Sequence, residues 1–215
     1  MKIGIDASRY QHDRPTGVEF YSDEIIDGLL PHITNQKKHE IVFFTPKKLK
    51  GIPAKMQKIL PFGRLWTQWH LSRELKKNPI DVLFVPSHVF PRNHPEKSYI
   101  TIHDVAFREF PDAYSAFQYF YLHSSTKYAV KHGAKIIVPS TATKRDLEKY
   151  YNCDPDKIVI IPHGFRPVKY KMSAQKEKKI LKKFHLTKKD PYIFFVGRLE
   201  TKKNLARLVL AFAIM

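Results

Sequence analysis

The sequence has very little cysteine and no long apolar run, and both absences narrow the class of protein. Cys153 is the one cysteine among 215 residues, so no internal disulfide can form, which is typical of a reducing compartment. No stretch approaches the roughly 18 apolar residues that a membrane-spanning helix requires. The N-terminus, MKIGIDAS, lacks the apolar region of a signal peptide. We therefore expect a cytoplasmic protein.

Three kinds of motif are also missing. The pattern G-x-G-x-x-G does not occur, so a dinucleotide site is not supported. The eleven histidines include no clear pair at helical metal-binding spacing near acids, and one cysteine cannot build a structural zinc site, so we expect no metal. No recognition-helix, zinc-finger or RNP-type signature is present, so we do not expect nucleic acid as a partner despite a net charge of +18.

Two basic stretches with almost no acidic residues carry nearly all of the net charge. Residues 41–73 contain seven Lys or Arg and no acid, and residues 166–189 contain ten Lys or Arg and one acid. Charge localised in this way indicates a functional face or a solvated linker. Stretch 41–73 also holds Trp66 and Trp69. One interpretation is peripheral contact with an anionic membrane, at its inner face; the other is that Trp69 packs in the core and the lysines are simply solvated.

Strand and helix patterns alternate along the chain and predict an α/β fold, a Rossmann-like doubly wound parallel sheet. About six strands fit into residues 1–165, including two apolar runs that are typical of buried strands. In the helix expected over 64–77, Leu65, Trp69 and Leu75 are available for one face. Gly133 stands where a helix commonly ends in the left-handed conformation. The expected strands cover 3–6, 40–45, 81–85, 99–103, 135–138 and 158–161; the expected helices begin at 16, 64, 114 and 140.

The character of the chain changes after Pro162. We expect residues 1–165 to form one domain and 166–190 to form a basic linker with a short amphipathic helix. Residues 191–215 then predict an incomplete second α/β domain, with a buried strand over 192–196 and a following helix that has apolar residues on one face. A lone strand-helix unit should leave that face exposed unless it docks on the first domain.

Three segments could carry chemistry. Thr16 and Gly17 stand at a helix start, where backbone N–H groups can bind an anion, and Thr16 with Glu19 fits a capping box. His103 and Asp104 follow a predicted strand at the edge where such sheets bind ligands. Segment 197–204 places Arg198 and Lys203 at a strand end and helix start, which favours phosphate binding. Each segment has a plainer alternative. The first is an ordinary helix start, the second is a histidine hydrogen-bonded to nearby backbone, and the third is a solvated basic turn.

Several segments, in order, resemble family 4 of the glycosyltransferases, which are retaining enzymes with the GT-B fold. They are IDAS and PTGVEFY at 5–21, DVLFVPSH at 81–88, TIHD at 101–104, IIVPSTATKRDL at 136–147, IVIIPHGF at 158–165 and FFVGRLETKKNLARLVLAF at 194–212. The resemblance covers the whole chain. It identifies residues 1–165 as the acceptor-side domain and 191–215 as the truncated start of the nucleotide-sugar domain.

The resemblance also implies roles for individual residues. Gly17 would let the backbone approach the donor phosphates, and His103 would lie near the transferred sugar. Arg198 and Lys203 would grip the donor diphosphate, so that neither a metal nor a cofactor is expected and the nucleotide sugar is a substrate. The acceptor would be a glycan or a lipid-linked sugar, as in polysaccharide biosynthesis. Residues expected to line the cleft are Asp104, Ser140, His163 and Gly164.

One part of the family pattern is missing. The two donor-site glutamates of the family lie further along its second domain than residue 215, so this chain lacks most of the nucleotide pocket. We expect a fragment of a glycosyltransferase that alone binds nucleotide sugar weakly or not at all. The alternative is a non-catalytic module that binds an acceptor.

Overall fold

The computed structural model describes residues 1–34, 38–61, 63, 65–165, 171–197 and 199–214. Residue contacts divide the chain into two compact units, Met1–His163 and Gly164–Met215. Each unit is described by itself.

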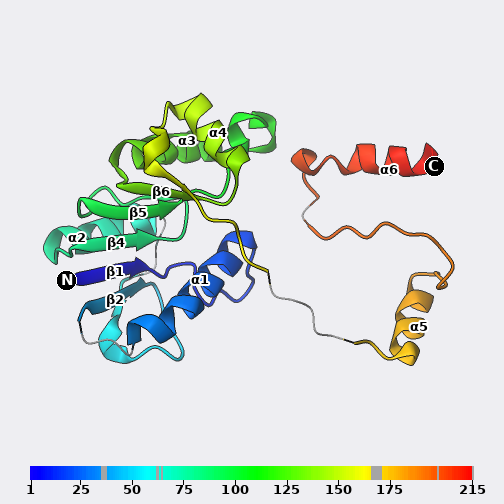
Figure 1. Ribbon diagram of the computed structural model, residues 1–215, viewed down its shortest axis with the longest axis horizontal. Helices are drawn as coiled ribbons and strands as arrows, with labels where there is room; N and C mark the ends of the chain where they lie inside the picture. The colour runs from blue at the N-terminus through cyan, green and yellow to red at the C-terminus, as the bar shows by residue number, and fades with distance from the viewer. Residues whose placement is uncertain (35–37, 62, 64, 166–170, 198, 215) are drawn as a thin grey trace. The chain divides into compact units, whose positions relative to one another are not determined.

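The first unit is built on a seven-stranded sheet in which all neighbouring strands run parallel, in the order β3-β2-β1-β4-β5-β6-β7 (Figure 1). This confirms the predicted α/β, doubly wound architecture. The order starts from β1 and grows outward in both directions, which creates a topological switch between β1 and β4. The strands are β1 Lys2–Asp6, β2 Glu40–Thr45, β3 Gln57–Ile59, β4 Val82–Val85, β5 Lys97–Thr101, β6 Lys135–Val138 and β7 Ile158–Ile160.

Two apolar clusters lie on opposite faces of this sheet. Helix α1 (Gly17–Thr34) contributes Ile26 to one cluster, which includes Ile5 and Phe43. The other, larger cluster receives buried residues from α2 (Ser72–Lys77), α3 (Ala116–His132) and α4 (Thr141–Tyr151). Figure 1 shows α3 and α4 next to β6, with α1 beside β1 and β2. Shorter turns are η1 Ala54–Met56, η2 Thr67–Leu71, η3 Ala106–Arg108, η4 Pro111–Ala113 and η5 Pro155–Lys157.

The edge strands differ from the sequence-based expectation. β3 was not among the predicted strands because it has three residues, with Lys58 at its centre and no apolar run. β7 was predicted to be buried, yet Val159 and Ile160 are exposed. An edge strand has a neighbour on one side only, so fewer side chains cover it, whatever its composition.

The expected helix over 64–77 does not present the predicted face. Residues Thr67–Leu71 form a π-helical turn ahead of α2, and this wider turn changes which side chains face the sheet. Trp66, Leu71 and Leu75 are buried, whereas Trp69 is 69% exposed. The interpretation that Trp69 packs in the core is therefore wrong. Residue 64, at the predicted start, lies outside the described residues.

Gly133 ends α3, but not in the left-handed conformation that its position suggested. Its φ is −66° and its ψ is 137°, which is extended backbone leading directly into β6. A Cβ at this residue would lie 2.9 Å from the carbonyl oxygen of Ala129. Glycine is required here for close approach of helix and strand rather than for a positive φ.

The second unit contains helices α5 (Ala174–Lys183) and α6 (Leu205–Ile214). The short turn η6 (Thr201–Lys203) lies directly before α6. Among the described residues of this unit no strand forms, so the predicted buried strand over 192–196 is wrong: these residues have no regular secondary structure and are exposed. A strand needs a neighbour for its N–H and C=O groups, and none is described in this unit. Within this unit no side chain of α6 is buried.

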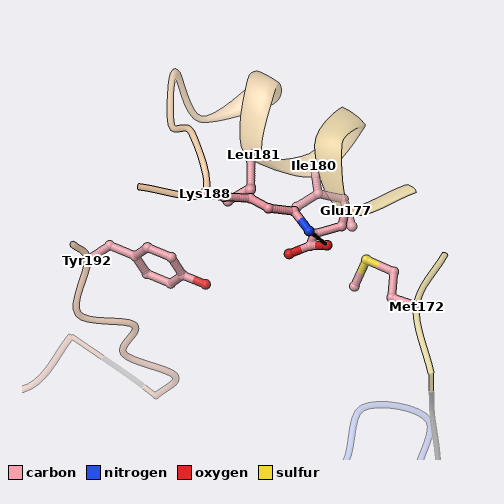
Figure 2. Close-up of a pocket in the computed structure, with 6 residues that line it drawn as sticks. All are labelled: Met172, Glu177, Ile180, Leu181, Lys188 and Tyr192. Atoms are coloured by element: carbon pink, nitrogen blue, oxygen red, sulfur yellow. Dashed lines mark ion pairs between the residues drawn. The ribbon is translucent and has the colours of Figure 1, made fainter. Parts of the chain in front are cut away.

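A shallow pocket lies within the second unit, between α5 and the segment that follows it (Figure 2). Lys188 and Glu177 form an ion pair there, with 2.6 Å between Nζ and Oε2. Ile180, Leu181 and Tyr192 supply its apolar walls. None of the predicted site residues that the structure describes lines this pocket, so it does not bear on their roles.

Candidate functional site

The candidate site lies at the carboxyl edge of the sheet, next to the switch between β1 and β4. The chain leaves β1 toward α1, which packs on one face, whereas the helices that follow β5 and β6 pack on the other face. Loops that diverge in this way leave a crevice in which doubly wound proteins bind ligands. His103, His88 and His163 all stand in loops beyond strand ends on this edge.

The loop after β1 is fixed to helix α1 by three polar contacts. Arg9 forms an ion pair with Glu19, with 3.0 Å between Nη1 and Oε1. The Tyr10 hydroxyl donates to Asp27 at 2.6 Å, and the backbone N–H of Gln11 donates to Asp23 at 2.7 Å. Because all three acceptors lie on α1, the loop and the start of the helix form one rigid wall of the site.

The start of α1 leaves backbone donors available to a ligand. Glu19 accepts hydrogen bonds from the backbone N–H of Thr16, at 3.0 Å, and from its hydroxyl. This is half of the predicted capping box, since the Thr16 hydroxyl donates to the carboxylate instead of accepting from the helix backbone. In the part of the chain that the structure describes, the amides of Gly17 and Val18 have no hydrogen-bond partner. A Cβ at Gly17 would meet no atom within 4 Å. Unpartnered amides at the positive end of a long helix are available to bind an anion.

Burial would raise the pKa of the Glu19 carboxyl, but the hydrogen bonds from Thr16 and the charge of Arg9 outweigh it and lower the pKa. Glu19 is therefore ionised at neutral pH. Arg9 offsets its negative charge next to the helix start, so an anion approaching Gly17 meets little repulsion.

His103 lies at the centre of a cluster of rings. Its Nδ1 is 3.3 Å from Nε2 of His163, and its Nε2 is 3.3 Å from the carbonyl oxygen of Pro86. The ring of His88 is 5.3 Å away between centroids. His88 is held in turn by its Nε2, which lies 2.9 Å from the carbonyl oxygen of Asp104. Loops after β4, β5 and β7 thus bring three histidines together.

Tyr21, in the second turn of α1, joins this cluster to the helix start. Its ring centroid is 4.8 Å from those of both His103 and His163. Its hydroxyl lies 3.1 Å from Oγ1 of Thr101, at the end of β5. The sequence patterns gave neither Tyr21 nor His88 a role in the site. Only the occurrence of both residues within the family-like segments could have suggested them.

The surroundings of the cluster keep its central histidine neutral. Burial and, to a smaller extent, the nearby His88 and His163 together lower the pKa of His103 to about 4, against the opposing hydrogen bond to Pro86 and the charge of Asp104. Burial also lowers the pKa of His88. At neutral pH both imidazoles are uncharged, so His103 acts as a hydrogen-bonding group rather than as a cation.

The other predicted residues fall into three groups. Asp104 and Ser140 have local structural partners: the Asp104 carboxylate accepts from the N–H of Ala106 at 3.0 Å, and the Ser140 hydroxyl caps α4 through the N–H of Thr143 at 3.2 Å. His163 contacts His103, as described above. Gly164 and Lys203 belong to the second unit, where both are exposed, and Arg198 lies outside the described residues. The proposed roles of all these residues stay predictions.

No group of three or more His, Cys, Asp or Glu side chains within the described ranges is arranged to hold a metal ion. The three clustered histidines bond to one another and to backbone carbonyls instead of turning their nitrogens toward a common point. No helix among the described residues is long and apolar enough to cross a membrane.

A seven-stranded, doubly wound parallel sheet with its polar residues at the carboxyl edge defines a Rossmann-like ligand-binding domain. The family model "Glycosyltransferase Family 4" matches residues 17–168, and the chain belongs to this family. No curated protein is significantly similar to it in sequence.

Two crystal structures of HepE from Anabaena have a similar fold. The complex with UDP-glucose has a TM-score of 0.51 and 13% sequence identity, and the complex with UDP and glucose has a TM-score of 0.50 and 15% identity. In both, the match covers 86% of this chain and 50% of the HepE chain. The chain thus spans about half the length of these glycosyltransferase structures.

Proposed function

We propose that the chain is the acceptor-side part of a glycosyltransferase that moves a sugar from a nucleotide-sugar donor to a glycan or lipid-linked acceptor, with retention of configuration. The observation that carries the proposal is the juxtaposition at one sheet edge of open helix-start amides at Gly17 and a neutral His103, connected through Tyr21. Amides suit the diphosphate and a neutral imidazole suits sugar hydroxyls. Membership of family 4 and the binding of UDP-glucose by HepE support it.

In the proposed reaction the bond between the anomeric carbon and the diphosphate oxygen breaks, and the acceptor oxygen bonds to that carbon on the same face. The acceptor proton passes to the leaving phosphate oxygen. Arg198 and Lys203 would stabilise the charge that develops on this phosphate, and losing one such group costs on the order of 10²–10³ in rate. These two cations make a metal unnecessary in the proposal.

Exposed aromatic rings support a carbohydrate acceptor. Phe117 and Phe120, in the first two turns of α3, are exposed, and Phe110 precedes them in the loop from β5. The rings of Phe117 and Tyr121 stack at an interplanar angle of 9°. This loop and helix start at the same sheet edge as His103. Flat, exposed rings at this edge offer the C–H faces of a sugar an apolar surface.

A second exposed surface supports contact with an anionic membrane. Trp69, Ile59 and Leu65 are exposed apolar residues within the acid-free segment 41–73. Lys55 and Lys58 are exposed in the same segment. Apolar side chains among cations are typical of proteins that lie on anionic lipid. We propose that this surface, which comprises Lys55, Lys58, Ile59, Leu65 and Trp69, brings a lipid-linked acceptor to the enzyme at the inner face of the membrane.

The phosphate site at Gly17 can be tested by NMR titration of the isotope-labelled chain with UDP-glucose. We expect weak binding with shift changes at the amides of Gly17 and Val18, and their loss in Gly17→Val, whose side chain fills the open space. A folded chain without changes at this edge would contradict the assignment. The isolated chain should show little sugar transfer, because its 215 residues contain no counterpart of the donor-site glutamates that the family resemblance implies; turnover comparable with a full-length relative would contradict that expectation.

The second candidate is a non-catalytic module that binds an acceptor. The exposed aromatic rings of α3 favour it as much as they favour the enzyme. It predicts glycan binding by the chain with no change at Gly17 on addition of any nucleotide sugar, so the same titration separates the two candidates.

A further inference from the structure

The carbonyl oxygen of Pro86 determines which nitrogen of His103 carries the proton. This oxygen lies 3.3 Å from Nε2 of His103, and a carbonyl oxygen can only accept a hydrogen bond. A neutral imidazole has a single N–H, so the proton is on Nε2 and Nδ1 holds a lone pair. Nδ1 of His103 is therefore an acceptor that requires a donor.

His163 is placed to be that donor. Its Nε2 lies 3.3 Å from Nδ1 of His103, and since this Nδ1 has no proton, the N–H of His163 has to donate. His163 stands three residues beyond the end of β7, and His103 stands two residues beyond β5. The bond thus connects loops of two strands that are separated in the sheet by β6.

Tyr21 fixes both rings from the opposite side. It meets His103 edge-on, at 83° between ring planes, and lies over His163 at 30°. The bond between its hydroxyl and Thr101 prevents the tyrosine ring from swinging away. Three elements, α1, β5 and the loop after β7, therefore determine the geometry of a single acceptor atom.

We propose that His163 is a positioning residue that holds the ring of His103 with Nδ1 turned toward the site, and that yields this position to a hydroxyl group of the ligand. A lone pair on an sp² nitrogen accepts one good hydrogen bond. A sugar hydroxyl that donates to Nδ1 therefore replaces the N–H of His163, whose side chain is exposed to solvent. The identity of the ligand as a sugar rests on the proposed function; the orientation of His103 by His163 does not.

Two substitutions separate hydrogen bonding from ring packing. His163→Gln keeps an N–H donor at about the reach of Nε2, and His163→Met keeps a side chain of similar length without any donor. His132→Met is the matched control, because His132 is an exposed histidine on α3 outside the cluster.

The experiment is long-range ¹H–¹⁵N NMR of histidine-labelled full chain between about pH 5 and 8. We expect His103 to be protonated on Nε2 in the native chain, with Nδ1 shifted upfield by its hydrogen bond. His163→Gln should preserve that shift, whereas His163→Met should move Nδ1 downfield and raise the pKa of His103, since the lost donor stabilised the neutral ring. His132→Met should change neither.

Two results would overturn the inference: a native His103 protonated on Nδ1, or an unchanged Nδ1 resonance and pKa in a folded His163→Met chain. Both are independent of sugar transfer. In an active protein that contains this chain, His163→Met should alter the pH profile of transfer and His163→Gln should restore it. Absence of any transfer would count against the proposed function and leave the NMR result standing.

Discussion

At the scale of single residues, two glycines show how structural and functional requirements differ. Gly4 lies in β1, where an added Cβ would come within 2.5 Å of Cδ1 of Ile80 and 2.6 Å of Cε2 of Phe44. At Gly17 an added Cβ meets nothing within 4 Å. We therefore expect Gly4→Ala to lower the free energy of unfolding by about 1–3 kcal/mol, as overpacked cores do.

Gly17→Ala should change the free energy of unfolding by less than about 0.5 kcal/mol, as at most surface positions. Urea unfolding of both variants measures the difference. A large loss of stability in Gly17→Ala would show that this glycine serves the fold, and would remove the reason to reserve its open space for a ligand.

His103 should make stability depend on pH. Its pKa in the folded chain is about 4, against an ordinary value of 6.5. Between these values the unfolded chain binds a proton that the folded chain does not, so stability is complete above about pH 6.5 and falls as the pH is lowered toward 4. At about 1.4 kcal/mol per pKa unit, the loss of stability is at most about 3.5 kcal/mol.

His103→Asn should flatten this part of the pH dependence, which urea unfolding at several pH values measures. His88 shares the lowered pKa, so part of the slope should remain in this variant. An unchanged slope in His103→Asn would mean that its imidazole is not held neutral by the fold.

The site could be predicted from the sequence only in part. His103 and Gly17 could be identified because each follows a strand or opens a helix within a family-like segment. The contacts of Tyr21 with His103 and His163 join residues about 80 and 140 positions apart, and nothing local in the sequence encodes such pairs. His163 was predicted to line the cleft, but its bond to His103 depends on the order of β5, β6 and β7 in the sheet.

At the scale of elements, prediction succeeded where local pattern and tertiary environment agree. The strand β2 covers Glu40–Thr45, as expected from the sequence, and helix α4 begins after Ser140, also as expected. The segment over 192–196 has an equally strong strand pattern but forms no strand, because a strand exists only with a partner. The π-helical turn at Thr67–Leu71 gives no sequence signal, and it is the reason that Trp69 faces outward.

Because Trp69 faces outward from this turn, we expect the chain to bind lipid. In co-sedimentation with vesicles, we expect the chain to bind anionic phospholipid and to bind neutral phosphatidylcholine poorly, since Lys55 supplies charge and Trp69 inserts, whereas Lys58 is paired with Glu74. Trp69→Ala should weaken binding several-fold without a loss of stability, because its side chain is exposed. Phe117→Ala is a matched control on another surface. Equal binding to both vesicle types would contradict the membrane proposal.

At the scale of the whole molecule, the family and the fold are established and the activity is proposed. The chain matches a glycosyltransferase family 4 model over residues 17–168 and spans half of the HepE chains that share its fold. Its first unit has a complete sheet with a polar edge, whereas its second unit has two exposed helices. In the proposed function, the polar edge of the first unit supplies the acceptor side of the site.

The most direct test is sugar transfer by a fusion in which residues 1–163 of this chain replace the matching half of HepE. In a fusion shown to be folded, we predict release of UDP from UDP-glucose in the presence of acceptor glycans. We expect His103→Ala and Gly17→Val each to reduce it by on the order of 10²-fold. A folded fusion whose turnover stays at background, or is unaffected by both substitutions, would contradict the assignment of this edge of the sheet as the site of sugar transfer.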